Sequence, residues 1–334
     1  MTKQTTVRPE LVDHKLIEGV LTRQAQPLAK AITLIESSRR DHQARAQQVL
    51  EALLPHSGKS IRIGISGAPG VGKSTFIEAL GLYLIERGHR LAVLAVDPSS
   101  TLTGGSILGD KTRMEQLSVN PNAYIRPSPT AGSLGGVAEK TREAMLLCEA
   151  AGYDVVIVET VGVGQSEITV AGMVDIFVLL QLPNAGDDLQ AIKKGIVEIA
   201  DLVVINKADL DPRAAELAQH QMQSALAMLR PASPNWKPVV LSVSSLKNKG
   251  MSEFWNEVAR FRQHMTGNGE FAAKRRHQAL DWMWGLIDGG LRTLLRSHPQ
   301  VKRELPQLSR AVEQGTLTPV LAAQKLLAHL QEKI

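Results

Sequence analysis

The sequence has almost no cysteine, few aromatic residues and no long hydrophobic run. Cys148 is the single cysteine among 334 residues, which excludes an intramolecular disulfide and favours a reducing compartment. We expect Cys148 to lie in the core, because free cysteine is usually buried. The longest apolar runs, such as Ile176–Leu182, are far shorter than the roughly 20 residues that a membrane-spanning helix needs. The sequence therefore predicts no membrane segment.

The N-terminus and the charge pattern exclude further classes. Residues 1–15 lack the apolar stretch of a signal peptide and include Glu10 and Asp13, so we expect a cytoplasmic protein. The 38 basic and 33 acidic residues are interspersed, which argues against a nucleic-acid surface despite the net charge of +5. The nine histidines are scattered along the sequence, unlike the ligands of a transition-metal site.

From residue 61 onward, short apolar runs alternate with helical stretches. This alternation is typical of an α/β fold in which a mostly parallel sheet is covered by helices on both faces. The expected strands are Ile61–Ser66, Leu91–Val96, Tyr124–Arg126, Val155–Glu159, Ile176–Leu182, Leu202–Ile205 and Val239–Leu241.

Helical segments flank this α/β region on both sides. The first sixty residues read as helix, with Pro27 in the first turn of a long one. Near the other end, an amphipathic helix over Phe271–Ser297 is followed by two shorter helices separated by Pro306 and Gly315. We divide the chain into an N-terminal helical region, 1–58, a P-loop domain, 59–266, and a C-terminal helical arm, 267–334.

The arm must bury its apolar face somewhere. Packing within the same subunit and pairing with a second subunit are both possible. Trp282, Trp284 and Leu286 favour the second, because large apolar side chains are enriched in subunit interfaces.

A phosphate-binding loop follows the first expected strand and precedes a helix, as the motif G-x-x-x-x-G-K-[ST] requires. Its glycines turn backbone N–H groups toward phosphate oxygens, and the helix start adds a positive end. Lys73 is predicted to reach the β- and γ-phosphates, and Ser74 to supply a hydroxyl to Mg²⁺. The loop consists of Gly67, Ala68, Pro69, Gly70, Val71, Gly72, Lys73, Ser74 and Thr75.

Carboxylates at the ends of the next strands are candidates for the metal, since Mg²⁺ prefers oxygen ligands. Asp97 follows one strand and Glu159 ends another. The string Glu159-Thr-Val-Gly162 resembles the D-x-x-G switch of GTPases with Glu in place of Asp, and Gly162 would offer its N–H to the γ-phosphate. Gln165 either positions the attacking water or is simply solvated on this loop. Lys73, Glu159 and Gln165 are the catalytic candidates.

A base-reading motif follows the strand Leu202–Ile205. Asp209 can accept two hydrogen bonds from guanine, whereas adenine lacks that donor pair. The Lys207 stem can lie on the base, and Asn206 can tie the loop together. Backbone N–H groups of Ser244, Ser245 and Leu246, after the next strand, are available to the guanine oxygen. The two motifs together predict binding of GTP and GDP with Mg²⁺.

Four longer strings give a family resemblance. They are Asp97-Pro-Ser-Ser-Thr101, Gly109-Asp-Lys-Thr-Arg-Met114, Glu159-Thr-Val-Gly-Val-Gly-Gln-Ser166 and Gly186-Asp-Asp-Leu-Gln-Ala-Ile-Lys-Lys194. With the two motifs, they resemble the MeaB/ArgK family of P-loop GTPases over nearly the whole chain. The resemblance implies a GTP-hydrolysing chaperone that binds methylmalonyl-CoA mutase and gates the loading and protection of its adenosylcobalamin.

The same resemblance implies roles for particular residues and for the arm. Asp97, Asp110 and Glu159 take metal or switch roles, and the C-terminal arm builds a homodimer. The loop from Asn184 to Lys194 becomes an additional switch, in which Asp187, Asp188 and Lys193 relay the nucleotide state to the mutase.

Two other functions remain possible from the sequence. A kinase or ATPase acting on a periplasmic arginine/ornithine-binding transport protein would prefer ATP, against which Asp209 argues. A nickel-insertion GTPase would need cysteine and histidine ligands, and the sequence offers one cysteine and scattered histidines.

Overall fold

The computed structural model describes residues 13–96, 114–127, 134–160, 166–183, 194–229, 231 and 233–331. The chain separates into two compact units, Met1–Lys274 and Arg275–Ile334. The first unit contains the sheet and both sequence motifs. Each unit is described by itself.

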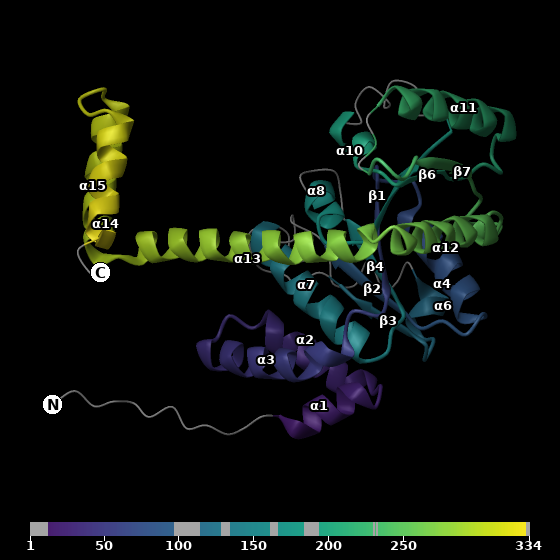
Figure 1. Cartoon of the computed structure of the whole chain (residues 1–334), viewed down its shortest axis with the longest axis horizontal. Coiled ribbons are helices and arrows are strands. Elements are labelled where there is room, and N and C mark those ends of the chain that lie inside the picture. Colours follow the sequence, from purple (N-terminus) through teal and green to yellow (C-terminus); the bar gives the residue numbers. More distant parts are fainter. Residues whose placement is uncertain are drawn as a thin grey trace. The chain divides into compact units, whose positions relative to one another are not determined.

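A seven-stranded parallel sheet forms the centre of the first unit (Figure 1), in the order β3-β2-β4-β1-β5-β6-β7. All seven expected strands are present, with ends that differ by one residue at most. β2, β4 and β5 are buried along their whole length, as near-continuous apolar runs predict. The strands are β1 (Ile61–Gly67), β2 (Leu91–Val96), β3 (Ala123–Arg126), β4 (Val155–Thr160), β5 (Ile176–Gln181), β6 (Leu202–Ile205) and β7 (Val239–Ser242).

Helices cover both faces of the sheet, which gives two hydrophobic cores. One core lies under α4 (Lys73–Ile85), α6 (Glu115–Ser118) and α12 (Met251–Gly267). The other lies under α7 (Leu134–Ala150), α8 (Ser166–Ala171), α10 (Lys194–Glu198) and α11 (Pro212–Met228). Alternate residues of each strand therefore serve opposite cores.

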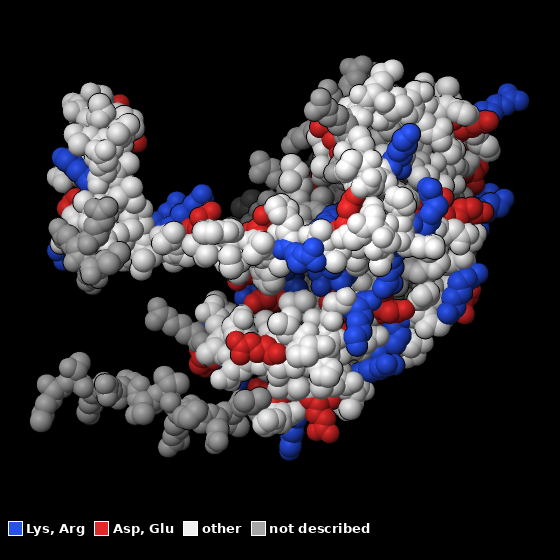
Figure 2. All heavy atoms as spheres, in the orientation of Figure 1, with Lys and Arg blue, Asp and Glu red and all other residues white. Residues whose placement is uncertain are grey.

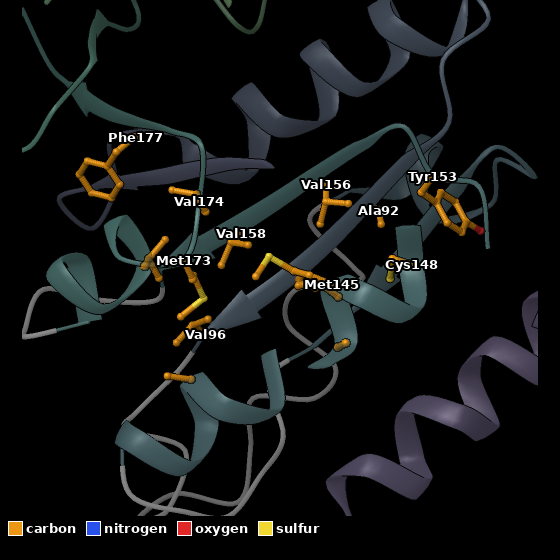
Figure 3. Close-up of a cluster of buried hydrophobic side chains, with 14 of the residues drawn as sticks. Ala92, Val96, Met145, Cys148, Tyr153, Val156, Val158, Met173, Val174 and Phe177 are labelled. Atoms are coloured by element: carbon orange, nitrogen blue, oxygen red, sulfur yellow. The ribbon is translucent and has the colours of Figure 1, made fainter. Parts of the chain in front are cut away.

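Cys148 of α7 is fully buried in the second core, as expected. Burial raises the pKa of its thiol, so it stays protonated and acts as a small apolar side chain. Figure 3 shows this cluster, in which α7 faces strand residues of the sheet. The labelled side chains are Ala92, Val96, Met145, Cys148, Tyr153, Val156, Val158, Met173, Val174 and Phe177.

The N-terminal region is helical, but it is divided into three helices, α1 (His14–Leu21), α2 (Ala25–Glu36) and α3 (Arg40–Leu53). Pro27 lies in the first turn of α2, as predicted. The expectation of one long helix is wrong, because Ser37 and Arg39 take extended backbone conformations between α2 and α3. A short 3₁₀ turn, Leu54–His56, then leads to the sheet. These helices pack against α7 and extend the second core.

The helix α13 (Glu270–Ser297) begins in the first unit and continues into the second. There, α14 (Pro299–Glu313) and α15 (Pro319–Gln331) pack together and bury Val301 and Ala322. Pro306 lies inside α14 and does not end a helix, contrary to expectation. Pro removes one backbone hydrogen bond, and the packing of α14 against α15 supports the helix there.

Charged residues of both signs are mixed on the face of the molecule that Figure 2 draws. Figure 2 shows lysine and arginine side chains next to aspartate and glutamate, without a large area of one sign. No helix among the described residues is long and apolar enough to cross a membrane.

Candidate nucleotide-binding site

The phosphate-binding loop connects β1 to α4 at the carboxyl edge of the sheet, where parallel α/β sheets bind ligands. Gly67 and Gly72 have φ angles of 154° and 94°. A Cβ on Gly67 would lie 2.6 Å from the Leu180 carbonyl oxygen, and one on Gly72 would lie 2.8 Å from Asn206 Nδ2. Glycine is therefore required at both positions by conformation and by close approach of neighbouring atoms.

Lys73 and Ser74 begin α4 at the mouth of this loop. Lys73 Nζ donates to the Gly67 carbonyl at 2.7 Å and to the Ala68 carbonyl at 3.3 Å, so its ammonium group lies across the loop. Ser74 Oγ donates to Glu159 Oε1 at 3.3 Å. Glu159 is 5% exposed at the end of β4, next to β1. The structure thus brings together the predicted phosphate ligand and two of the predicted metal ligands.

Asn206 connects the base motif to both neighbouring loops. Its Nδ2 donates to the Val71 carbonyl at 2.9 Å, and its Oδ1 accepts from Ser245 N at 3.2 Å and from Ser245 Oγ at 2.7 Å. The side chain is 1% exposed, so these hydrogen bonds are shielded from water. Asn206 ties the loop together, as the sequence predicted.

Lys207 has a left-handed backbone conformation, with φ of 60°, and its Nζ donates to the Gly70 carbonyl at 2.9 Å. The chain therefore turns sharply after β6, and the Lys207 stem joins the base motif to the phosphate-binding loop. That the Lys207 stem lies on the base stays a prediction.

Asp209 is oriented by the loop after β7. Ser244 Oγ donates to Asp209 Oδ1 at 2.5 Å, and Lys247 Nζ lies 3.8 Å from Asp209 Oδ2. The Ser244 hydroxyl, and to a smaller extent the charge of Lys247, lower the pKa of Asp209. The carboxylate is thus kept ionised as a hydrogen-bond acceptor, which is the state that would pair with guanine donors.

Sequence reasoning missed the part of Lys247. It assigned only backbone groups to Ser244–Leu246, whereas the structure adds the Ser244 side chain and the neighbouring lysine. The signal was available, because Lys247 directly follows the predicted loop. Leu246 is 79% exposed, so its side chain is free to meet a base.

Several predicted site residues lie outside the described residues. They are Asp97, Asp110, Gly162, Gln165, Asp187, Asp188 and Lys193. Within the described part of the chain, no group of three or more His, Cys, Asp or Glu residues could hold a metal ion. Ser74 and Glu159 are the candidate metal ligands whose geometry is defined.

Comparisons with known proteins identify the family of the chain. The family model for methylmalonyl-CoA mutase-associated GTPase MeaB matches residues 28–300. A Mycobacterium tuberculosis protein named "Probable GTPase" is 57% identical over 320 residues, covering 94% of this chain and 95% of its own. The mouse "Methylmalonic aciduria type A homolog, mitochondrial" is 49% identical over 324 residues, covering 94% of this chain and 78% of its own.

A solved structure has the same fold over almost the entire length. It is titled "Crystal structure of LAO/AO transport system kinase" and is 38% identical, with a TM-score of 0.79, covering 98% of this chain and 100% of that one. The phosphate-binding loop, the guanine-type base motif and the extent of these matches lead to one conclusion. The chain is a P-loop GTPase that belongs to the MeaB family.

Proposed function

We propose that this GTPase is a chaperone of a cobalamin-dependent acyl-CoA mutase of the methylmalonyl-CoA mutase type, and that it gates loading and protection of adenosylcobalamin. The observation that carries the proposal is the match of residues 28–300 to a family named for association with that mutase. The relative named for methylmalonic aciduria supports the same client.

Each site residue has a separate role in nucleotide binding or hydrolysis. Lys73 neutralises charge that develops on the transferred phosphoryl group, and the loop N–H groups hold the phosphates in line. Asp209 selects guanine through paired hydrogen bonds. Leu246, exposed in the same loop as Ser244 and Lys247, offers an apolar side chain that could cover the base.

Mg²⁺ fits the donor set beside the phosphate-binding loop. Ser74 Oγ and Glu159 Oε1 are hard oxygen donors that already lie 3.3 Å apart. Mg²⁺ usually takes one or two carboxylates together with waters and phosphate oxygens, so two protein donors are enough. The ion would neutralise negative charge on the bound phosphates. Asp97 and Asp110 remain proposed contributors from the family resemblance.

The C-terminal helices are proposed to form a homodimer. The second unit exposes large apolar side chains, among them Trp284 at 60%, although such side chains usually find a partner surface. The others are Leu280, Met283, Leu286, Ile287, Leu291, Leu294, Leu305, Val320, Leu321 and Leu327. Light scattering of the full chain should give twice the monomer mass, and Trp284→Arg should shift it to the monomer.

A binding and turnover experiment tests the client. GTP hydrolysis is measured with and without purified methylmalonyl-CoA mutase, and complex formation is followed with GDP and with a non-hydrolysable GTP analogue. We expect nucleotide-dependent binding and faster hydrolysis in the complex. Absence of both binding and rate change would remove the mutase from the proposal and leave the GTPase activity intact.

A second candidate is a kinase acting on a periplasmic arginine/ornithine-binding transport protein. The similar solved structure of a LAO/AO transport system kinase favours it. The orientation of Asp209 by Ser244 favours guanine over adenine, which disagrees with an ATP-dependent kinase. A competition assay decides between them: preference for ATP together with phosphate transfer to such a protein would support the kinase.

A further inference from the structure

A group of buried polar side chains lies at the carboxyl edge of the sheet, on the face opposite α4. Thr160 of β4 donates from Oγ1 to Ser66 Oγ of β1 at 2.9 Å, and both residues are at most 2% exposed. Ser166 of α8 and Gln181 at the end of β5 are 1% and 4% exposed. Strand alternation places Gln181 on this face, because Phe177 and Leu179 belong to the core under α7 and α8.

Two atoms of this group have no hydrogen-bond partner among the described residues. They are Gln181 Nε2 and Ser166 Oγ, and both are buried. Burying a donor or an acceptor without a partner costs free energy, so nearly all such groups in native proteins are paired. One atom is an amide donor and the other a hydroxyl that can accept, which makes them chemically suited to each other.

Gln181 lies between the two ends of the nucleotide site. Its backbone carbonyl oxygen accepts a hydrogen bond of 2.8 Å from the backbone N–H of Asn206, at the start of the base motif. The preceding residue, Leu180, pairs with Gly67, the first residue of the phosphate-binding loop. A movement of Gln181 is therefore linked through the backbone to both motifs.

Ser166 is the first residue of α8, which packs on β1, β4 and β5. This packing is close, because a Cβ built on Gly64 of β1 would lie 2.9 Å from the side chain of Val170 in α8. Thr160, at the end of β4, belongs to the string Glu159–Gly162 that resembles a GTPase switch, and Ser166 follows that string by four residues. A small shift of α8 on β5 changes the distance between Ser166 and Gln181.

We propose that Gln181 and Ser166 are positioning residues for GTP hydrolysis. In the GTP-bound protein, Gln181 Nε2 donates a hydrogen bond to Ser166 Oγ, and this bond holds the start of α8 against β5. In the GDP-bound protein the bond is open. A ligand shifts such an equilibrium only through contacts that differ between the two states, and a γ-phosphate that orders a switch supplies the difference. The proposal requires GTP hydrolysis by this chain and does not require the mutase.

The test is a double-mutant cycle in the full chain with Gln181→Met, Ser166→Ala and the double variant. Thr141→Val is the matched control, because Thr141 is also buried on this face but donates to the Val137 carbonyl of its own helix at 2.9 Å. Single-turnover hydrolysis, affinity for GDP and for a GTP analogue, and Tm in each nucleotide state are measured.

We expect each single variant to slow single-turnover hydrolysis about two- to tenfold, the range of one ordinary hydrogen bond. The double variant should be no slower than the slower single variant, because both changes remove the same bond. The Tm difference between analogue-loaded and GDP-loaded protein should narrow. Affinity for GDP should stay the same, and Thr141→Val should change neither the rate nor the Tm difference.

Three results overturn the proposal. The first is a rate loss in the double variant equal to the product of the two single losses. The second is an equal Tm shift in the two nucleotide states, and the third is an unchanged hydrolysis rate in both single variants. Equal Tm shifts would mean that each atom has a structural role or is paired with water. If Gln181→Met does not fold, Ser166→Ala alone decides, since an unchanged Tm difference and rate in that variant also overturn the proposal.

Discussion

The buried carboxylates Glu149 and Glu159 lie at opposite edges of the sheet and differ in their hydrogen bonds. At the amino edge, Glu149 has no exposed side-chain surface and pairs with Arg62, with 2.8 Å between Arg62 Nε and Glu149 Oε1. It also accepts from Ser60 Oγ at 2.5 Å and from Gly58 N at 2.7 Å. At the carboxyl edge, the buried Glu159 has a weaker contact with Ser74, at 3.3 Å. The close hydrogen bonds of Glu149 indicate a structural carboxylate, whereas the longer hydrogen bond between Ser74 and Glu159 joins two residues of the candidate metal site.

A second buried carboxylate at the amino edge, Asp201, is also held by partners within the protein, among them Lys274. Lys274 Nζ donates to the Asp175 carbonyl at 2.6 Å and lies 3.8 Å from Asp201 Oδ2. Burial raises the pKa of Asp201, and the charge of Lys274 acts in the opposite direction. Asp201 also accepts from Phe177 N at 2.8 Å, so this carboxylate holds β5 and β6 in register with the start of α13.

The largest expected effect comes from breaking the amino edge. Arg62→Met should lower the free energy of unfolding by about 3–5 kcal/mol, because it leaves Glu149 buried without its charge partner. Urea denaturation measures the change. GTP affinity of the remaining folded protein should be unaltered. If Arg62→Met lost GTP affinity but kept most of its free energy of unfolding, the amino edge would not be purely structural.

The next effect is on catalysis at the carboxyl edge. Lys73→Met should reduce kcat about 10²–10³-fold, because one preorganised charge is removed from the phosphoryl group in the transition state. We expect little change in urea denaturation, since the Lys73 ammonium group donates to backbone carbonyls of the phosphate-binding loop, whereas Arg62 pairs with the buried carboxylate of Glu149. Single-turnover hydrolysis gives the rate. A strongly destabilised Lys73→Met protein would show that this edge is structural as well.

A smaller change is expected at the base pocket. Asp209→Asn should weaken GTP binding about ten- to a hundredfold, since a charged hydrogen-bond acceptor for guanine is lost. The amide offers a donor where the carboxylate accepts, so affinity for xanthosine triphosphate should rise. Competition titration with the two nucleotides measures both. Unchanged GTP affinity would show that Asp209 does not read the base.

Acid should affect the amino edge selectively. Burial raises the pKa of Glu149, but its hydrogen bond with Arg62 and its other partners outweigh this and lower it below the usual value. The stabilisation is therefore present above the unfolded pKa, about 4.3, and is lost as the pH falls through the folded pKa. Denaturation of wild-type protein and Glu149→Gln between about pH 5 and pH 3 should show a flatter pH dependence in the variant. Parallel curves would contradict this assignment.

The smallest effect is expected for an exposed ion pair of similar length. Arg45 Nη2 lies 2.5 Å from Asp13 Oδ2, with side chains 45% and 24% exposed. Arg45→Met should change stability by less than about 1 kcal/mol, because water screens this pair. It is the matched control for Arg62→Met, and similar losses in both would show that burial does not explain the difference.

Much of the fold follows from the sequence. Apolar runs bounded by polar residues located all seven strands. The signal is continuous in β2, β4 and β5, which are buried along their whole length, and shorter in the half-buried edge strands β3 and β7. The sequence did not predict the division of the N-terminal region into three helices or the position of Pro306 inside α14. Helix breaks at Ser37 and Arg39 carry no proline or glycine, and the packing of α14 against α15 overrides the local preference at Pro306.

In the candidate site, too, some features follow from the sequence and others only from the structure. Motif spacing located the phosphate-binding loop, Asn206, Lys207 and Asp209, since each acts through its own backbone or side chain near a strand end. Spacing did not locate Lys247 beside Asp209, because two loops must meet in space for that contact. The pair of unpartnered atoms on Ser166 and Gln181 is also visible only when burial is known.

The sequence by itself determined the ligand class and the parallel α/β architecture, because both depend on local patterns of glycine, apolar residues and motif order. The tertiary structure decided which polar side chains are satisfied. Arg62 and Glu149 are 87 residues apart, and Ser74 and Glu159 are 85 apart, yet one pair is closely bonded and the other loosely. That difference depends on burial and on the positions of partner atoms across the sheet, which no local pattern encodes.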